Sequence, residues 1–205
     1  MSYRCFDANS ATLAVGDVEA GPEHHDTGSG LLFIAGAAGS AFGVVAPTSR
    51  SAIYISSTLS QSPLWMSVHA VSWALWYSLL GLGFLGLHRR YGQAFPLSII
   101  WLTFVTAVIQ VLLVPMIFVD LDRTLVILRT GMAVCGTSMT ALTLVAGGYS
   151  LREMREQSKD KALVETTGTG LIIGGIAAVF PLTAAIASLS SFLVLLFFLE
   201  EYRAR

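Results

Sequence analysis

Charged residues are scarce in this 205-residue chain, where Asp, Glu, Lys and Arg together make up only 12% of the sequence. They are missing from four long runs, residues 51–88, 91–119, 130–151 and 166–199. A water-facing surface needs charge every few residues, whereas a helix that crosses lipid needs about twenty apolar residues. The scarcity therefore argues against a soluble domain. Together with a hydrophobic content of 54%, it predicts a polytopic integral membrane protein.

Catalytic and ligand-binding signatures are missing as well. The two cysteines, Cys5 and Cys135, occupy a tail and an apolar run, so they give no disulfide framework and no metal-ligand spacing. Paired carboxylates, an activated serine and a metal cluster are absent at membrane depth, which argues against an enzyme. The net charge of −1 argues against a nucleic-acid partner. We therefore expect neither a cofactor nor a metal.

The first 29 residues carry five acidic residues against Arg4 and have no apolar periodicity, so they predict an acidic mobile tail. The segment from Glu23 to Asp26 contains two adjacent histidines that could hold a metal ion. Good metal sites need fixed geometry, so solvated side chains are the preferred interpretation. The tail also lacks the basic region and cleavage site of a conventional signal peptide.

Residues 30–205 predict one all-α domain, a transmembrane helical bundle. Ser62 and Pro63 suit the N-cap and the first position of a helix, and Pro96 likewise opens a span. Residues 50–62 are interpreted as a loop or a short interfacial helix, and residues 151–165 as an extension of the fourth helix into water. Five spans are expected, with four or six as alternatives: residues 30–47, 63–87, 96–119, 124–149 and 168–199.

The last run is ambiguous, because residues 166–199 are too many for one minimal span. Divided at Pro181, each half would reach only about 20 Å, which is too short for the hydrocarbon core. One long, tilted or kinked helix is therefore expected.

Lys and Arg counts predict the orientation. Loop 88–95 contains Arg89 and Arg90, and loop 150–165 contains four basic residues, whereas loop 120–123 contains only Arg123. The positive-inside rule places the first two loops in the cytoplasm and loop 120–123 outside. Five spans would put the C-terminus outside, where Arg203 and Arg205 fit poorly, so six crossings stay open.

A stripe of small residues follows the last predicted span at helical spacing. Small residues let helix backbones approach closely in lipid. The stripe is interpreted first as an internal seam of the bundle, with a homo-oligomer or membrane-protein partner interface as the alternative. Its members are Gly170, Gly174, Ala177, Pro181, Ala184, Ser188 and Ser191.

The second predicted span carries Trp65, His69, Trp73 and Trp76 on one face. A haem would need a second axial histidine at matching depth, and no other histidine lies inside a predicted span, so a packing histidine is the expectation.

Counting helix rise from the span ends places His69, Gln110 and Arg129 at a similar depth near the outer face, with Asp122 just outside on the stripe of Arg129. Polar residues inside a membrane tend to face a partner or a cavity. Arg129 could instead extend outward to Asp122 or to lipid phosphate, leaving His69 and Gln110 to join helices.

Two functions follow from these patterns. The first is a non-enzymatic structural or accessory role through helix contacts, favoured by the small-residue stripe and the missing chemistry. The alternative is a small-molecule or ion binder or transporter, with a polar site built from His69, Gln110 and Arg129, flanked by Trp73, Trp76 and Asp122.

Overall fold

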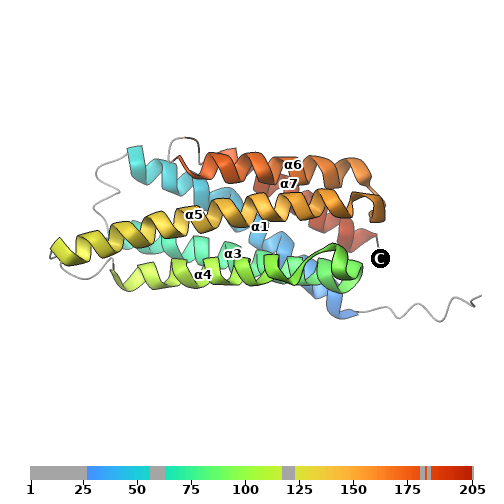
Figure 1. Ribbon diagram of the computed structural model, residues 1–205, viewed down its shortest axis with the longest axis horizontal. Helices are drawn as coiled ribbons and strands as arrows, with labels where there is room; N and C mark the ends of the chain where they lie inside the picture. Colours follow the sequence, from blue (N-terminus) through green and yellow to red (C-terminus); the bar gives the residue numbers. More distant parts are fainter. Residues whose placement is uncertain (1–26, 56–62, 117–122, 181–182, 184–185, 205) are drawn as a thin grey trace, which may run out of the picture.

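The computed structural model describes residues 27–55, 63–116, 123–180, 183 and 186–204. All regular elements in these ranges are helices. Residues 1–26 of the predicted tail and most of loop 120–123 lie outside them, whereas residues 27–29, also assigned to the tail, form the start of a helix. With the labels of Figure 1, the elements are α1 (Thr27–Ile55), α3 (Pro63–Tyr91), η1 (Gly92–Ala94), α4 (Leu97–Met116), α5 (Arg123–Glu153), η2 (Met154–Gln157), α6 (Lys161–Ala178) and α7 (Ile186–Arg203).

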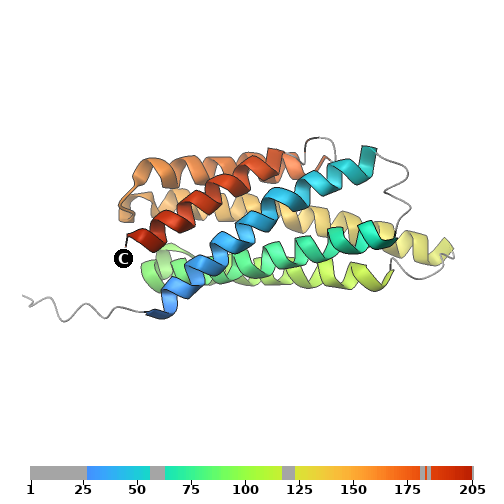
Figure 2. The same ribbon diagram turned by 180° about the vertical axis from the view of Figure 1, so that it is seen from behind.

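The helices form a closed ring in which each α-helix contacts the next one along the chain. The principal contacts join α1 with α3, α3 with α4, α4 with α5, α5 with α6 and α6 with α7, and α7 closes the ring on α1. The six α-helices of the described ranges extend along the long axis of the molecule, as Figures 1 and 2 show from opposite sides. Short connections between antiparallel neighbours are typical of a helical bundle, so the all-α prediction is confirmed.

The first two helices of the ring meet through glycine. A Cβ atom added to Gly36 would lie 2.7 Å from the Cα of Gly83, and one added to Gly39 would lie 2.8 Å from the backbone nitrogen of Leu80. Glycine therefore allows backbone-to-backbone approach in this interface. Helix α3 begins at Pro63, as expected, whereas α1 continues to Ile55 through residues expected to form a loop or a separate helix.

The prediction of one long helix over residues 168–199 is wrong, because two antiparallel helices, α6 and α7, occupy this region. The Oγ of Ser190 in α7 donates to the carbonyl oxygen of Gly170 in α6 at 2.6 Å. The length argument failed because both helices include charged end residues. Each has 18 residues, which corresponds to about 27 Å rather than 20 Å.

The charged segment after α5 is likewise not an extension of that helix. Helix α5 ends at Glu153, η2 follows, and α6 begins at Lys161. Asp160 caps α6, because its side chain accepts a hydrogen bond from the backbone nitrogen of Leu163 at 2.9 Å. Chain reversal at this point supplies the additional antiparallel helix.

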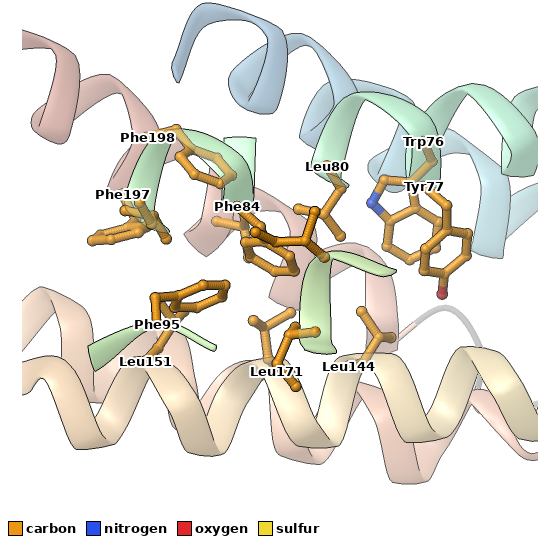
Figure 3. Packing of buried hydrophobic residues seen from close by; sticks show 14 of the residues in the cluster. Trp76, Tyr77, Leu80, Phe84, Phe95, Leu144, Leu151, Leu171, Phe197 and Phe198 are labelled. Carbon is orange, nitrogen blue, oxygen red and sulfur yellow. The ribbon is translucent and has the colours of Figure 1, made fainter. Parts of the chain in front are cut away.

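Aromatic side chains fill the interior of the ring. Trp76 and Tyr77 stack with ring centroids 4.9 Å apart, and Phe84 and Phe95 lie at the same separation. Figure 3 shows these side chains between the helices, together with Leu144 of α5. The fully buried aromatic residues are Phe33, Trp73, Trp76, Tyr77, Phe84, Phe95, Phe197 and Phe198.

Large apolar side chains also cover the outside. Among the described residues, three helical stretches are long and apolar enough to cross a membrane, Ser29–Ala46, Ser67–Tyr91 and Val134–Gln157, and α4 adds the shorter apolar stretch Leu97–Leu112. Every α-helix exposes such residues, for example Leu31, Val71, Trp101, Leu142, Ile173 and Leu189. An outer surface of this composition suits hydrocarbon better than water.

The two ends of the bundle differ in the number of Lys and Arg residues. The end formed by the start of α1, the α3–α4 and α5–α6 connections and the end of α7 is called the basic end. It carries seven of the Lys and Arg residues whose backbone is described: Arg89, Arg90, Arg152, Arg155, Lys159, Lys161 and Arg203. The other three, Arg50, Arg123 and Arg129, lie toward the opposite end.

Candidate functional site

The aromatic face of α3 lies mainly in the interface with α1. Trp73 is 2% exposed, and its Nε1 donates to the carbonyl oxygen of Ala46 at 3.1 Å. His69 is half-buried and meets the Trp73 ring edge-on, with centroids 5.8 Å apart. Trp76 is 1% exposed and lies beside Gly43, where an added Cβ would collide with its indole. Trp73 and Trp76 thus serve helix packing, and His69 lies at the edge of the same cluster.

Gln110 belongs to a row of polar side chains along α4 that faces α5. It is 8% exposed, and one turn earlier the Thr106 hydroxyl lies 3.0 Å from the Thr143 hydroxyl of α5. Thr103 and Thr140 are buried on the same helices and donate to carbonyl oxygens of their own helices. Hydroxyl pairs of this kind join helices at modest gain, about 0.6 kcal/mol on average in a membrane.

The Thr106–Thr143 pair also sets the register of α4 against α5. Because the helices are antiparallel, Gln110 of α4 lies beside about residue 139 of α5. Arg129 precedes that residue by ten positions. Ten residues correspond to about 15 Å at helix rise, so Gln110 and Arg129 do not lie at one level along these helices. Figure 1 shows the corresponding end of α5 extending past α4. The side chain of Arg129 and all of Asp122 lie outside the described residues, so their expected pairing stays a prediction.

The stripe of small residues is divided between the two last helices. Gly170 and Gly174 of α6 face α7, where a Cβ added to Gly174 would collide with the Oγ of Ser190. Ser188 and Ser191 are buried on α7, Ala177 is buried on α6, and the Ser191 hydroxyl lies beside Gly43 of α1. These members of the stripe contribute to contacts within the bundle. Pro181 and Ala184 lie outside the described residues.

A polar cluster around Glu201 was not predicted from the sequence. Glu201 of α7 is only 5% exposed, yet its carboxylate has three side-chain partners. Arg90 forms an ion pair with it at 2.9 Å, the Tyr91 hydroxyl lies 2.9 and 3.0 Å from its two oxygens, and the Ser158 hydroxyl donates at 3.4 Å. The arginine also donates to the backbone oxygens of Glu201 at 2.8 Å and Ala204 at 3.4 Å. These four side chains are called the Glu201 cluster.

The Glu201 cluster fastens the C-terminal helix to the end of α3 and to the connection before α6. A buried carboxylate is costly unless it is paired and hydrogen-bonded, and here both conditions are met. The expected five-span topology hid this contact, because it placed Arg90 and Glu201 at opposite faces of the membrane. The available signal was that Arg89–Arg90 and Glu200–Glu201 each follow an apolar run directly.

A second group of charges lies on the surface of the basic end. Arg155 contacts Glu156 at 3.1 Å and Glu165 at 2.8 Å, and Lys161 also pairs with Glu156. Solvent and salt screen exposed pairs of this kind, so they contribute little to stability.

Within the described residues, no group of three or more His, Cys, Asp or Glu side chains could hold a metal ion. The segment Glu23–Asp26 lies outside those residues. The single carboxylate of the Glu201 cluster is engaged in an ion pair and in hydrogen bonds. The cluster therefore stabilises the contact between helices, and it leaves no carboxylate available for acid–base chemistry.

Comparisons with protein-family models, curated proteins and solved structures found no match. The role of the chain is therefore inferred from its own geometry.

Proposed function

We propose that this chain is a multi-pass membrane protein whose six helices cross the bilayer and whose role is non-enzymatic, exerted through helix contacts. The observation that carries the proposal is the distribution of side chains. Large apolar residues cover the outside of every helix, while the charged residues of the described chain gather at its ends. Acyl chains can solvate such an apolar surface, and helices satisfy their own backbone polar groups without water.

The proposed topology has both ends of the helical domain on the cytoplasmic side. Six antiparallel crossings return the chain to its starting face, and the Glu201 cluster joins the end of α7 to the end of α3. Seven Lys and Arg residues at the basic end against three toward the other end favour a cytoplasmic basic end by the positive-inside rule. Arg203, which fitted poorly outside in a five-span topology, then lies inside.

A structural or accessory role is supported by the filled interior. Among the described residues, eight fully buried aromatic side chains occupy the space between the helices. Figure 3 shows several of them, from α3, from the connection before α4 and from α7, on the side of the core that faces Leu144 and Leu171. A transport pathway would need a polar or hydrated route through this region. The alternative of a ligand site built from His69, Gln110 and Arg129 is weakened by the 15 Å offset along the helix axes.

Two experiments test this proposal. Alkaline carbonate should leave the full-length protein in the membrane fraction, and detergent should release it; release by carbonate would contradict membrane integration. A photo-crosslinking residue is then placed at one outward position per helix: Leu31, Val71, Trp101, Leu142, Ile173 and Leu189. A contact role predicts adducts to another protein, or to a second copy of this chain, at one or more of these positions. Lipid adducts alone at all six positions would contradict that role.

A further inference from the structure

An open groove of about 420 Å³ lies at the basic end, between the end of α5, η2 and the start of α6. It is lined by Tyr149, Arg152 and Glu153 of α5, Arg155 and Glu156 of η2, and Glu165 of α6. Its position at the end of an apolar stretch of α5 is the level at which lipid headgroups would lie. The inference below rests on the proposed membrane function.

Most charges around this groove neutralise one another. Arg155 bridges Glu156 and Glu165, and Lys161 neutralises Glu156 further, so two cations meet two anions. Arg152 and Glu153 are exposed, and neither has an ion pair or hydrogen bond to the described part of the chain. The groove thus presents one available cation beside one available anion.

Arg152 is positioned by its stem. Helices α5 and α6 come close where Gly148 faces Gly168, and a Cβ added to Gly168 would lie 2.7 Å from the Cγ of Arg152. The aliphatic part of the arginine therefore lies across a glycine, which leaves its guanidinium at the groove. Tyr149, 56% exposed, precedes Arg152 by three residues and so lies one turn deeper on a neighbouring face.

Two adjacent residues of opposite charge above an exposed tyrosine are complementary to a zwitterionic headgroup. A guanidinium binds phosphate through two parallel hydrogen bonds, and a carboxylate accepts hydrogen bonds from a primary ammonium. Tyrosine is typical of the boundary between headgroups and acyl chains. We propose that this groove binds the phosphoethanolamine headgroup of a membrane lipid, with Arg152 on the phosphate, Glu153 on the ammonium and Tyr149 against the glycerol region.

The chemistry separates three lipids. Choline is quaternary and has no N–H to donate to Glu153, and phosphatidylglycerol has no cation at all. The full-length protein in detergent is titrated with dioctanoyl phosphatidylethanolamine, phosphatidylcholine or phosphatidylglycerol, and adducts are counted by native mass spectrometry. We expect the ethanolamine lipid to bind about tenfold more tightly than either of the others, which corresponds to one charge-assisted hydrogen bond.

Two variants assign the contacts. Glu153→Gln should lower ethanolamine binding to the level of choline while choline binding stays unchanged, and Arg152→Gln should weaken both. Arg89→Gln and Glu200→Gln, exposed positions at the same end but outside the groove, are the matched controls and should change neither. The proposal would be overturned if phosphatidylglycerol bound at least as tightly as phosphatidylethanolamine, or if the control variants lost as much binding as the groove variants. Either result would indicate general attraction to the basic end.

Soluble phosphoethanolamine distinguishes the headgroup alone from the lipid. The proposal expects it to displace the lipid only at much higher concentration, because the tyrosine and acyl contacts are missing; displacement at equal concentration would overturn the lipid assignment. Carbonate extraction of the same variants separates the two proposals. Membrane integration without lipid selectivity refutes the groove alone, whereas loss of integration in the unmodified protein refutes the membrane function.

Discussion

Substitution of Glu201 by glutamine should destabilise the bundle far more than the same change at its neighbour Glu200. Glu201 is buried in the Glu201 cluster, whereas the Glu200 side chain is 49% exposed and lies 3.9 Å from Arg203. The two substitutions remove the same charge from adjacent positions of one helix. The comparison therefore isolates the contribution of the buried contacts.

The magnitude follows from what each partner retains. In Glu201→Gln the ion pair at 2.9 Å is lost, and the amide group brings donors toward Arg90 and Tyr91. Arg90 keeps its bonds to the backbone oxygens of Glu201 and Ala204, so it is not left without partners. We expect a loss of about 2–4 kcal/mol in the free energy of unfolding. Glu200→Gln should cost less than about 0.5 kcal/mol.

Removal of the arginine should cost more than removal of the carboxylate. Arg90→Gln leaves the buried carboxylate with only the hydroxyls of Tyr91 and Ser158, so its charge has no counterion in the cluster. Breaking a buried pair in this direction costs about 3–5 kcal/mol. The double variant should be less destabilised than the sum of the singles, because the two residues share one interaction.

Unfolding in mixed micelles with increasing sodium dodecyl sulfate, followed by circular dichroism, measures these differences. Equal midpoints for Glu201→Gln and Glu200→Gln would refute the reasoning, because a buried and engaged carboxylate cannot then be holding α7 to α3. Additive effects of the Arg90 and Glu201 substitutions would refute the pairing itself.

Four further substitutions test packing in the same unfolding assay or by thermal shift. Gly174→Ala should destabilise the bundle by about 1–3 kcal/mol, because the added Cβ collides with α7. Gly131→Ala is the control and should be neutral or slightly stabilising, because a Cβ added there has nothing within 4 Å. Equal effects of the two substitutions would contradict close packing of α6 against α7. Trp73→Phe should cost about 1 kcal/mol, because it removes the hydrogen bond to Ala46, and an unchanged midpoint would contradict that bond's contribution. His69→Phe should leave the thermal midpoint and its pH dependence between about pH 5 and 8 unchanged, and a lost pH dependence would instead favour a polar site at this histidine.

The helical class and several boundaries could be predicted from local patterns. Long runs without charge predict apolar helices, and Pro63 marks the start of α3 because proline suits the first helical turn. Within residues 30–47, Gly39 lies against the backbone of α3, an approach that small residues permit. These features depend only on residues close in sequence.

The remaining features depend on contacts between distant residues. The division of residues 161–203 into two helices was missed because charged residues were counted as loop, although Asp160 is a recognisable N-cap. Arg90 and Glu201 are 111 positions apart, so their pairing follows only from the correct number of helices. The prediction that Gln110 and Arg129 lie at the same depth was wrong because each depth was counted from the end of its own helix. Figure 1 shows that α5 extends beyond α4, so these ends do not lie at one level.

Sided labelling of single cysteines tests the six-crossing topology most directly. In a background with Cys5 and Cys135 replaced by serine, cysteine is introduced at Arg89, Arg203 or Arg123, and a membrane-impermeant maleimide is applied to sealed vesicles of known orientation. We expect positions 89 and 203 to react only from the cytoplasmic face and position 123 only from the opposite face. Labelling of position 203 from the same side as position 123 would contradict the closed six-helix ring as a membrane topology.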